Sequence, residues 1–115
     1  MRIQGKAKHV CIYVGKSDQW HGLPLYEAIV QKAKQEGLAG ATVVEGIEGY
    51  GANSLIHHES ALALSSDRPV RIEITDIAER VDIFLQTLEE MVTEGLITLQ
   101  SCEVVKYVHS PSASS

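Results

Sequence analysis

The sequence predicts one α+β domain with the element order β-α-β-β-α-β, in which two helices cover one face of a four-stranded antiparallel sheet. Three observations support this fold class. Segments with helical periodicity alternate with segments of period two along the chain. The composition, with 44% apolar and 22% charged residues, is that of an ordinary globular domain. The length of 115 residues is enough to bury a core without a disulfide or a metal.

The first half of the chain predicts a strand, a helix and a second strand. Val10, Ile12 and Val14 alternate with less apolar residues, which is typical of a strand. A helix is expected from Pro24, a residue favoured in the first turn, to Gly37, a common C-terminal stop. Residues 41–48 then predict the second strand.

The second half repeats the pattern in the order strand, helix, strand. Residues 68–75 predict a strand, in which Val70, Ile72 and Ile74 alternate with Arg71, Glu73 and Thr75. Asp76 and Glu79 have the spacing of a capping box, which predicts a helix that continues to Gly95. Residues 102–108 predict the last strand. This order is the ferredoxin-like one, in which the second and third strands are neighbours joined by a hairpin connection.

Composition excludes some function classes. The net charge is −5 and the ten Lys and Arg residues form no cluster, so we expect no nucleic-acid partner. The chain has no apolar run long enough to cross a bilayer and no signal-peptide segment at its start, so we expect a cytoplasmic protein that is not membrane-embedded. Cys11 and Cys102 lie in apolar strand patterns and are expected to be reduced, buried thiols.

The connection between the second and third strands is unusually long. The second strand runs into three glycines, Gly46, Gly49 and Gly51, and then into a segment that contains His57 and His58. Connections of this length inside a small domain are uncommon and are usually functional or disordered.

Three segments of the chain resemble the PII-like proteins called domain of unknown function 190. They are GLPLYEAIVQKAKQEGLAGATVVEGIEGYGA, LSSDRPVRIEITD and LEEMVTEGLITLQSCEVVKY, and the similarity extends over residues 8–108. The resemblance implies a single PII-like domain over residues 1–110, assembled as a homotrimer. It also implies that residues 50–66 correspond to the PII T-loop, while residues 111–115 are expected to be a disordered tail.

The resemblance further implies a signalling or regulatory protein that is not an enzyme. Its small ligand, such as an adenine nucleotide, would bind in a cleft between subunits, and its T-loop would contact a membrane transporter or a metabolic enzyme. The implied ligand-binding residues are Gly46, Gly49, Tyr50, Gly51, Asn53, Gly95 and Arg71. The implied partner-contacting residues are Leu55, Ile56, His57, His58 and Leu62.

The chain departs from PII proteins at two positions that would face a phosphate. The turn TEGLIT before the last strand has a single glycine, Gly95, and no lysine, so it is a poor cradle for a triphosphate. Glu45 stands where many relatives are expected to carry arginine, and a carboxylate there would repel an anion. We therefore expect a nucleoside monophosphate, a cyclic nucleotide or a nucleoside as the ligand.

Two other functions remain open from the sequence. A trimeric metal-binding protein of the copper-tolerance type would use His57 and His58, although adjacent histidines point in different directions in regular structure. A small ferredoxin-like enzyme is the second alternative. The sequence contains no recognisable serine, cysteine or zinc-hydrolase motif that would support it.

Overall fold

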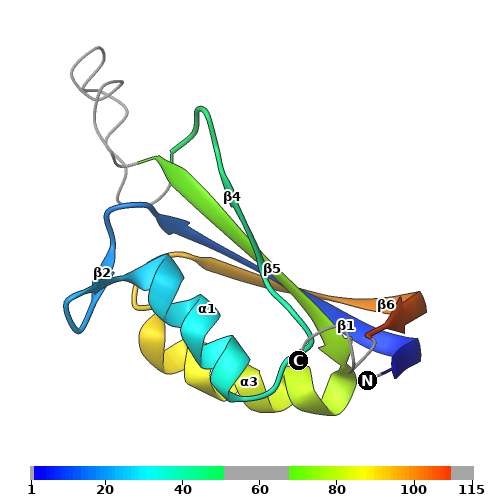
Figure 1. Ribbon diagram of the computed structural model, residues 1–115. Helices are drawn as coiled ribbons and strands as arrows, with labels where there is room; N and C mark the ends of the chain where they lie inside the picture. Colours follow the sequence, from blue (N-terminus) through cyan, green and yellow to red (C-terminus); the bar gives the residue numbers. More distant parts are fainter. Residues whose placement is uncertain (1, 51–67, 110–115) are drawn as a thin grey trace.

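The computed structural model describes residues 2–50 and 68–109, and these form one four-stranded sheet with two helices packed on one of its faces (Figure 1). The strand order is β4-β5-β1-β6, and every neighbouring pair is antiparallel. The large strands are β1 (Arg2–Gly15), β4 (Thr42–Glu45), β5 (Pro69–Ile77) and β6 (Leu96–Val108). The helices are α1 (Leu25–Gln35) and α3 (Ala78–Met91). The predicted α+β, ferredoxin-like fold is confirmed.

The core lies between the sheet and the helices. Strand β5 alternates between buried and half-buried side chains along its length, as its period-two sequence predicts. The side chains that are fully enclosed come from both central strands and both helices, and they include Val10, Ile12, Ile29, Ile72, Ile74, Val81, Phe84 and Leu88. Gly37 ends α1 in a left-handed conformation with φ of 81°, as expected for a helix stop.

Strand boundaries differ from the prediction because pairing extends the central strand. Strand β1 begins at Arg2, since its first residues pair with the end of β6. Strand β6 begins at Leu96, which pairs with Tyr13, although its first residues show little apolar alternation. Strand β4 ends at Glu45, ahead of the glycines. A short hairpin of β2 (Gln19–Trp20) and β3 (Leu23–Pro24) also lies before α1.

The predicted capping box at Asp76 is wrong. Helix α3 begins at Ala78, and its N-cap residue, Ile77, makes no side-chain capping bond. Asp76 is instead the buried residue before the end of β5, with 0% of its surface exposed. Its Oδ2 accepts a hydrogen bond from the Ala39 N–H at 2.9 Å, and Oδ1 lies 3.7 Å from the Arg80 guanidinium. The carboxylate therefore fastens the α1–β4 connection to β5.

The sheet face opposite the helices is called the open face below, because no helix of the described residues covers it (Figure 1). Strand register places side chains on this face in rows across the sheet. One row runs Val44, Arg71, Tyr13 and Leu96, and the next runs Thr42, Glu73, Cys11 and Thr98. A third row contains Thr75, His9 and Gln100.

Candidate functional site

Register brings the long β4–β5 connection and the TEGLIT turn to the same end of the sheet. Glu45, the last residue of β4, pairs with Val70, and Val70 pairs with Val14 near the end of β1. The first residue of β6, Leu96, pairs with Tyr13. The base of the connection and Gly95 therefore lie along one edge of the molecule, which we call the loop end.

Gly46 and Gly49 pack against one proline at the loop end. The Gly46 N–H donates to the Pro69 carbonyl oxygen at 2.7 Å. A Cβ atom at Gly46 would lie 2.8 Å from Pro69 Cγ, and one at Gly49 would lie 3.1 Å from the same atom. The proline ring therefore leaves no room for a side chain at Gly46 and little room for one at Gly49. Their predicted contact with a ligand stays a prediction.

Three charged side chains surround the base of the connection. Lys16 Nζ lies 3.1 Å from Glu45 Oε1, and Arg68 lies 3.6 Å from Glu45 Oε2. The Lys16 N–H also donates to the Arg68 carbonyl oxygen at 2.8 Å. Glu45 is therefore paired with two cations, and the cluster keeps an excess of one positive charge. The repulsion of anions expected from Glu45 alone is offset by these neighbours.

Gly95 fits tightly against the end of β1. Its φ is 151°, and a Cβ atom there would lie 2.6 Å from the Tyr13 carbonyl oxygen and 3.1 Å from Val92 Cγ1. Since the nearest atom belongs to backbone, the turn has no room for a side chain at this position. The predicted ligand-binding role of Gly95 is untested, whereas its packing role is evident.

Arg71 belongs to the open face. Its Nε lies 2.7 Å from Glu73 Oε2 and forms an ion pair with it. The geometry at Nε does not meet the criteria of a hydrogen bond. A hydrogen bond with Tyr13 and the negative charge of Glu73 raise the pKa of the Arg71 guanidinium. The side chain is therefore engaged within its own sheet face. Its predicted contact with a ligand stays a prediction.

Tyr50 is 70% exposed and free to stack on a flat ligand. The other predicted binding and contact residues lie outside the described residues: Gly51, Asn53, Leu55, Ile56, His57, His58 and Leu62. The structure thus brings Gly46, Gly49 and Gly95 to one end of the sheet, and places Arg71 on its open face.

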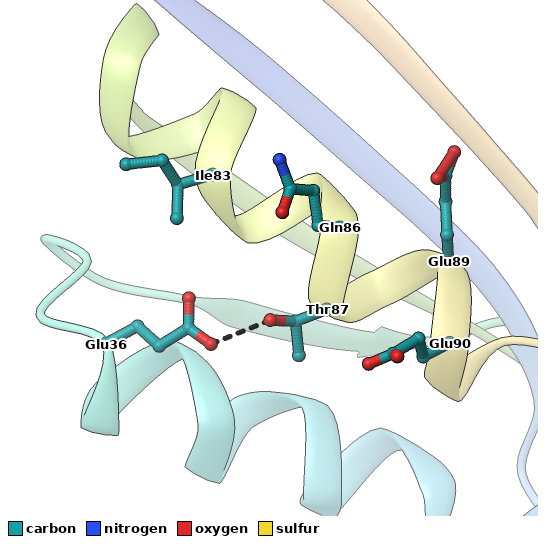
Figure 2. A pocket seen from close by; sticks show the side chains of 6 residues that line it. All are labelled: Glu36, Ile83, Gln86, Thr87, Glu89 and Glu90. Carbon is teal, nitrogen blue, oxygen red and sulfur yellow. Dashed lines mark hydrogen bonds between the residues drawn. The ribbon is translucent and has the colours of Figure 1, made fainter.

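Two hollows occur elsewhere on the described part of the molecule. The first, of about 660 Å³, lies between α1 and α3 and is lined by Glu36, Glu89, Glu90 and Ile83, among others (Figure 2). The Thr87 hydroxyl donates to Glu36 Oε2 there at 2.8 Å. With several carboxylates and no basic residue in its lining, this hollow is unsuited to an anionic ligand.

The second hollow lies on the open face and was missed by sequence reasoning. It has a volume of about 460 Å³, and its lining includes His9, Glu73, Thr75, Lys106 and Tyr107. The Tyr107 hydroxyl donates to the Ala39 carbonyl oxygen at 3.1 Å. In the predicted first strand, His9 is one of the residues that alternate with the apolar ones. The strand pattern does not reveal its neighbours, because only the β1–β5 register brings it next to Glu73 and Thr75.

Comparison with known proteins identifies the family. Residues 7–104 match domain of unknown function 190, described as an uncharacterized ACR, and the chain belongs to this family. A UPF0166 protein of Aquifex aeolicus is 36% identical over 100 residues, which cover 87% of this chain and 94% of that protein. A UPF0166 protein of Methanocaldococcus jannaschii is 38% identical over 102 residues, which cover 88% of this chain and 94% of that protein.

Solved structures share the fold at low sequence identity. A PII-like signalling protein of Thermus thermophilus superposes with a TM-score of 0.64 at 19% identity, covering 88% of this chain and 91% of that one. CPII of Thiomonas intermedia, bound to ADP and bicarbonate, has a TM-score of 0.63 at 15% identity, covering 90% and 91%. CutA of Synechococcus elongatus has a TM-score of 0.58 at 11% identity, covering 93% and 85%. The chain therefore has a PII-like fold.

The described residues contain no helix that is long and apolar enough to cross a membrane.

Proposed function

We propose that this chain is a cytoplasmic PII-like regulatory protein that assembles as a homotrimer, binds a small ligand between subunits and contacts a partner through residues 50–66. The observation that carries the proposal is the β4–β5 connection. The two strands are antiparallel neighbours, yet residues 46–68 separate them, whereas hairpin loops usually have about 2–5 residues. A connection of this length between two neighbouring strands supports a T-loop-like role for residues 50–66.

The open face supports assembly. The row Val44, Arg71, Tyr13 and Leu96 places three large apolar side chains on a sheet face that no helix of the described residues covers. Of these, Leu96 is 54% exposed and Val44 is 41% exposed. A sheet normally buries its apolar face against another layer, and in a trimer this layer would be a second copy of the chain.

Light scattering coupled to size-exclusion chromatography tests the assembly. The expected mass is three times the chain mass of 12.6 kDa. Leu96→Asp should lower the mass toward that of one chain, because it puts a charge into the proposed interface. The matched control, Ile83→Asp, changes a 63% exposed residue on α3 and should leave the trimer intact. A wild-type monomer at all concentrations would rule out the trimer and any site between subunits.

The loop end supports a small anionic ligand. Lys16 and Arg68 supply positive charge there, and exposed Tyr50 supplies a surface on which a base could stack. Adenine nucleotides are the first ligands to test, because CPII, which shares the fold, binds ADP. The turn TEGLIT contains one glycine and no lysine, so a monophosphate or cyclic nucleotide should bind better than ATP.

Calorimetry with AMP, cyclic AMP, ADP and ATP tests the ligand. We expect AMP or cyclic AMP to bind best, and Arg68→Gln and Tyr50→Ala to weaken the binding at least fivefold. Lys34→Gln, on the solvent face of α1, is the matched control and should change nothing. Tight binding of ATP through its triphosphate would show that the TEGLIT turn does accommodate a triphosphate. Failure of all four nucleotides to bind would count against a nucleotide sensor.

A further inference from the structure

Three side chains with metal-binding atoms converge on the open face. His9 and Cys11 alternate on β1, and Glu73 is the direct partner of Cys11 on β5. His9 Nε2 lies 3.4 Å from Cys11 Sγ and 3.5 Å from Glu73 Oε1. The three donor atoms all lie within 4.8 Å of one another. We propose that His9, Cys11 and Glu73 form a binding site for a divalent transition-metal ion, with Zn²⁺ as the preferred cation.

The two separations from His9 Nε2 fit tetrahedral zinc. Zinc binds cysteine sulfur at about 2.3 Å and histidine nitrogen or carboxylate oxygen at about 2.0–2.2 Å, so two ligands of a tetrahedral ion are about 3.3–3.7 Å apart. Both separations from His9 Nε2 are in this range. The donor set of one nitrogen, one sulfur and one oxygen also suits zinc better than magnesium or calcium, which prefer oxygen ligands alone.

Neighbouring groups already hold two of the ligands in position. His9 Nδ1 lies 2.7 Å from Thr75 Oγ1. With the proton on Nδ1 donated to Thr75, the lone pair of Nε2 faces Cys11 and Glu73, as a metal-binding imidazole requires. Arg71 pairs with Glu73 Oε2, which leaves Oε1 as the oxygen that faces His9. Glu73 would thus bind the ion through one oxygen.

In a single chain the site opens into the hollow on the open face, and in the proposed trimer it would lie beside the second copy that covers this face. His9, Glu73 and Thr75 line that hollow, and all three ligands are half-buried rather than enclosed. A zinc ion held by three side chains keeps a fourth position, which water or a small ligand can occupy. Binding would release the Cys11 thiol proton to solvent, since the thiolate is the form that binds metal.

Zinc titration of the reduced, full-length protein against a chromophoric chelator tests the site. We expect one Zn²⁺ per chain. Cys11→Ser and His9→Gln should each lower the affinity at least tenfold, and Cys102→Ser, which changes the other thiol of the sheet, should leave it unchanged. Glu73→Gln should also weaken binding. A cooperative unfolding transition of each variant, measured without zinc, shows that the variant is folded. Cys11→Ser is also nearly isosteric. Undiminished binding in both Cys11→Ser and His9→Gln overturns the proposal.

Cobalt substitution tests the ligands without any mutation. Co²⁺ added to the wild-type protein should give a thiolate-to-cobalt charge-transfer band, which Cys11→Ser abolishes and Cys102→Ser retains. Absence of this band in the wild type overturns the proposal. A His57→Gln/His58→Gln variant should keep full affinity. Loss of binding there would assign the metal to residues 57 and 58 instead.

Thr75→Val tests the positioning of His9. The change keeps the side-chain shape and removes the hydroxyl that lies beside Nδ1, so zinc affinity should fall about 10- to 100-fold. The cobalt charge-transfer band should persist, because Cys11 is still present. Unchanged zinc affinity would show that Thr75 does not orient the imidazole, and would count against the site as described.

Discussion

The Tyr107 hydroxyl, on edge strand β6, donates a hydrogen bond to the Ala39 carbonyl oxygen in the connection that leads to β4, the opposite edge of the sheet. The Ala39 N–H donates in turn to the buried carboxylate of Asp76. Both polar backbone groups of one residue are thus satisfied by side chains from two different strands. These two bonds hold the α1–β4 connection at Ala39. Removing either the Tyr107 hydroxyl or the Asp76 carboxylate should therefore lower the stability of the protein.

Tyr107→Phe should lower the free energy of unfolding by about 1 kcal/mol, because one hydrogen bond to a carbonyl oxygen is lost while the ring remains. Chemical denaturation followed by circular dichroism measures this. Tyr50→Phe, in which the ring is largely exposed, is the control and should have no effect. Equal stability of Tyr107→Phe and the wild type would show that water replaces the hydroxyl without loss.

Asp76→Ala should lower the free energy of unfolding by about 2–3 kcal/mol, because the Ala39 and Ile77 N–H groups both lose their acceptor. Asp82→Ala is the matched control. It removes a carboxylate that pairs with Lys8 at the surface, and such exposed pairs contribute about 0–1 kcal/mol. A similar loss for both variants would mean that burial of Asp76 does not matter for stability.

Gly95→Ala should destabilise the fold by about 2–4 kcal/mol, through backbone strain and through contact with the Tyr13 carbonyl oxygen. Gly40→Ala is the control, because a Cβ atom there meets open space. It should be neutral or stabilising by up to about 1 kcal/mol, since alanine reduces the freedom of the unfolded chain. Thermal and chemical unfolding of both variants compares them directly.

Gly46→Ala should lower the free energy of unfolding by about 1–3 kcal/mol, because the added methyl group clashes with the Pro69 ring. Pro69→Ala removes the ring atom concerned, so the double variant should be more stable than the sum of the single effects predicts. A double-mutant cycle gives this coupling, which we expect to be about 1–2 kcal/mol. Additive effects would show that the ring does not dictate glycine at position 46.

The sequence predicted the fold well where side-chain periodicity decides the structure. The alternation in residues 70–75 and the glycine stop at Gly37 are local signals, and both are confirmed. Pairing between distant strands is not local. It extends β1 back to Arg2 and moves the start of β6 to Leu96, because backbone hydrogen bonds to a neighbour override weak propensity. Asp76 has the local spacing of a helix cap. Its actual hydrogen-bond partner, the Ala39 N–H, is remote in sequence, so no local pattern indicates it.

The candidate site could be predicted only in part. The glycines of the loop end were visible as residues, but their packing on Pro69 and on Tyr13 depends on tertiary structure. The opposing charge of Glu45 was visible, whereas its pairing with Lys16 and Arg68 was not. His9, Cys11 and Glu73 showed no sequence motif, because the ligands come from two strands whose register no local pattern reveals.

The central position of β1 has a consequence for the order of folding. Its partners are β5 and β6, so β1 pairs with two strands that are synthesised much later than itself. A ribosome-bound chain that ends before residue 69 cannot form any ladder of β1 with either partner, and contacts this distant in sequence form slowly. Such a chain also lacks α3, the helix that packs against β1. Nascent chains should therefore resist proteolysis only once β6 has left the ribosome exit tunnel.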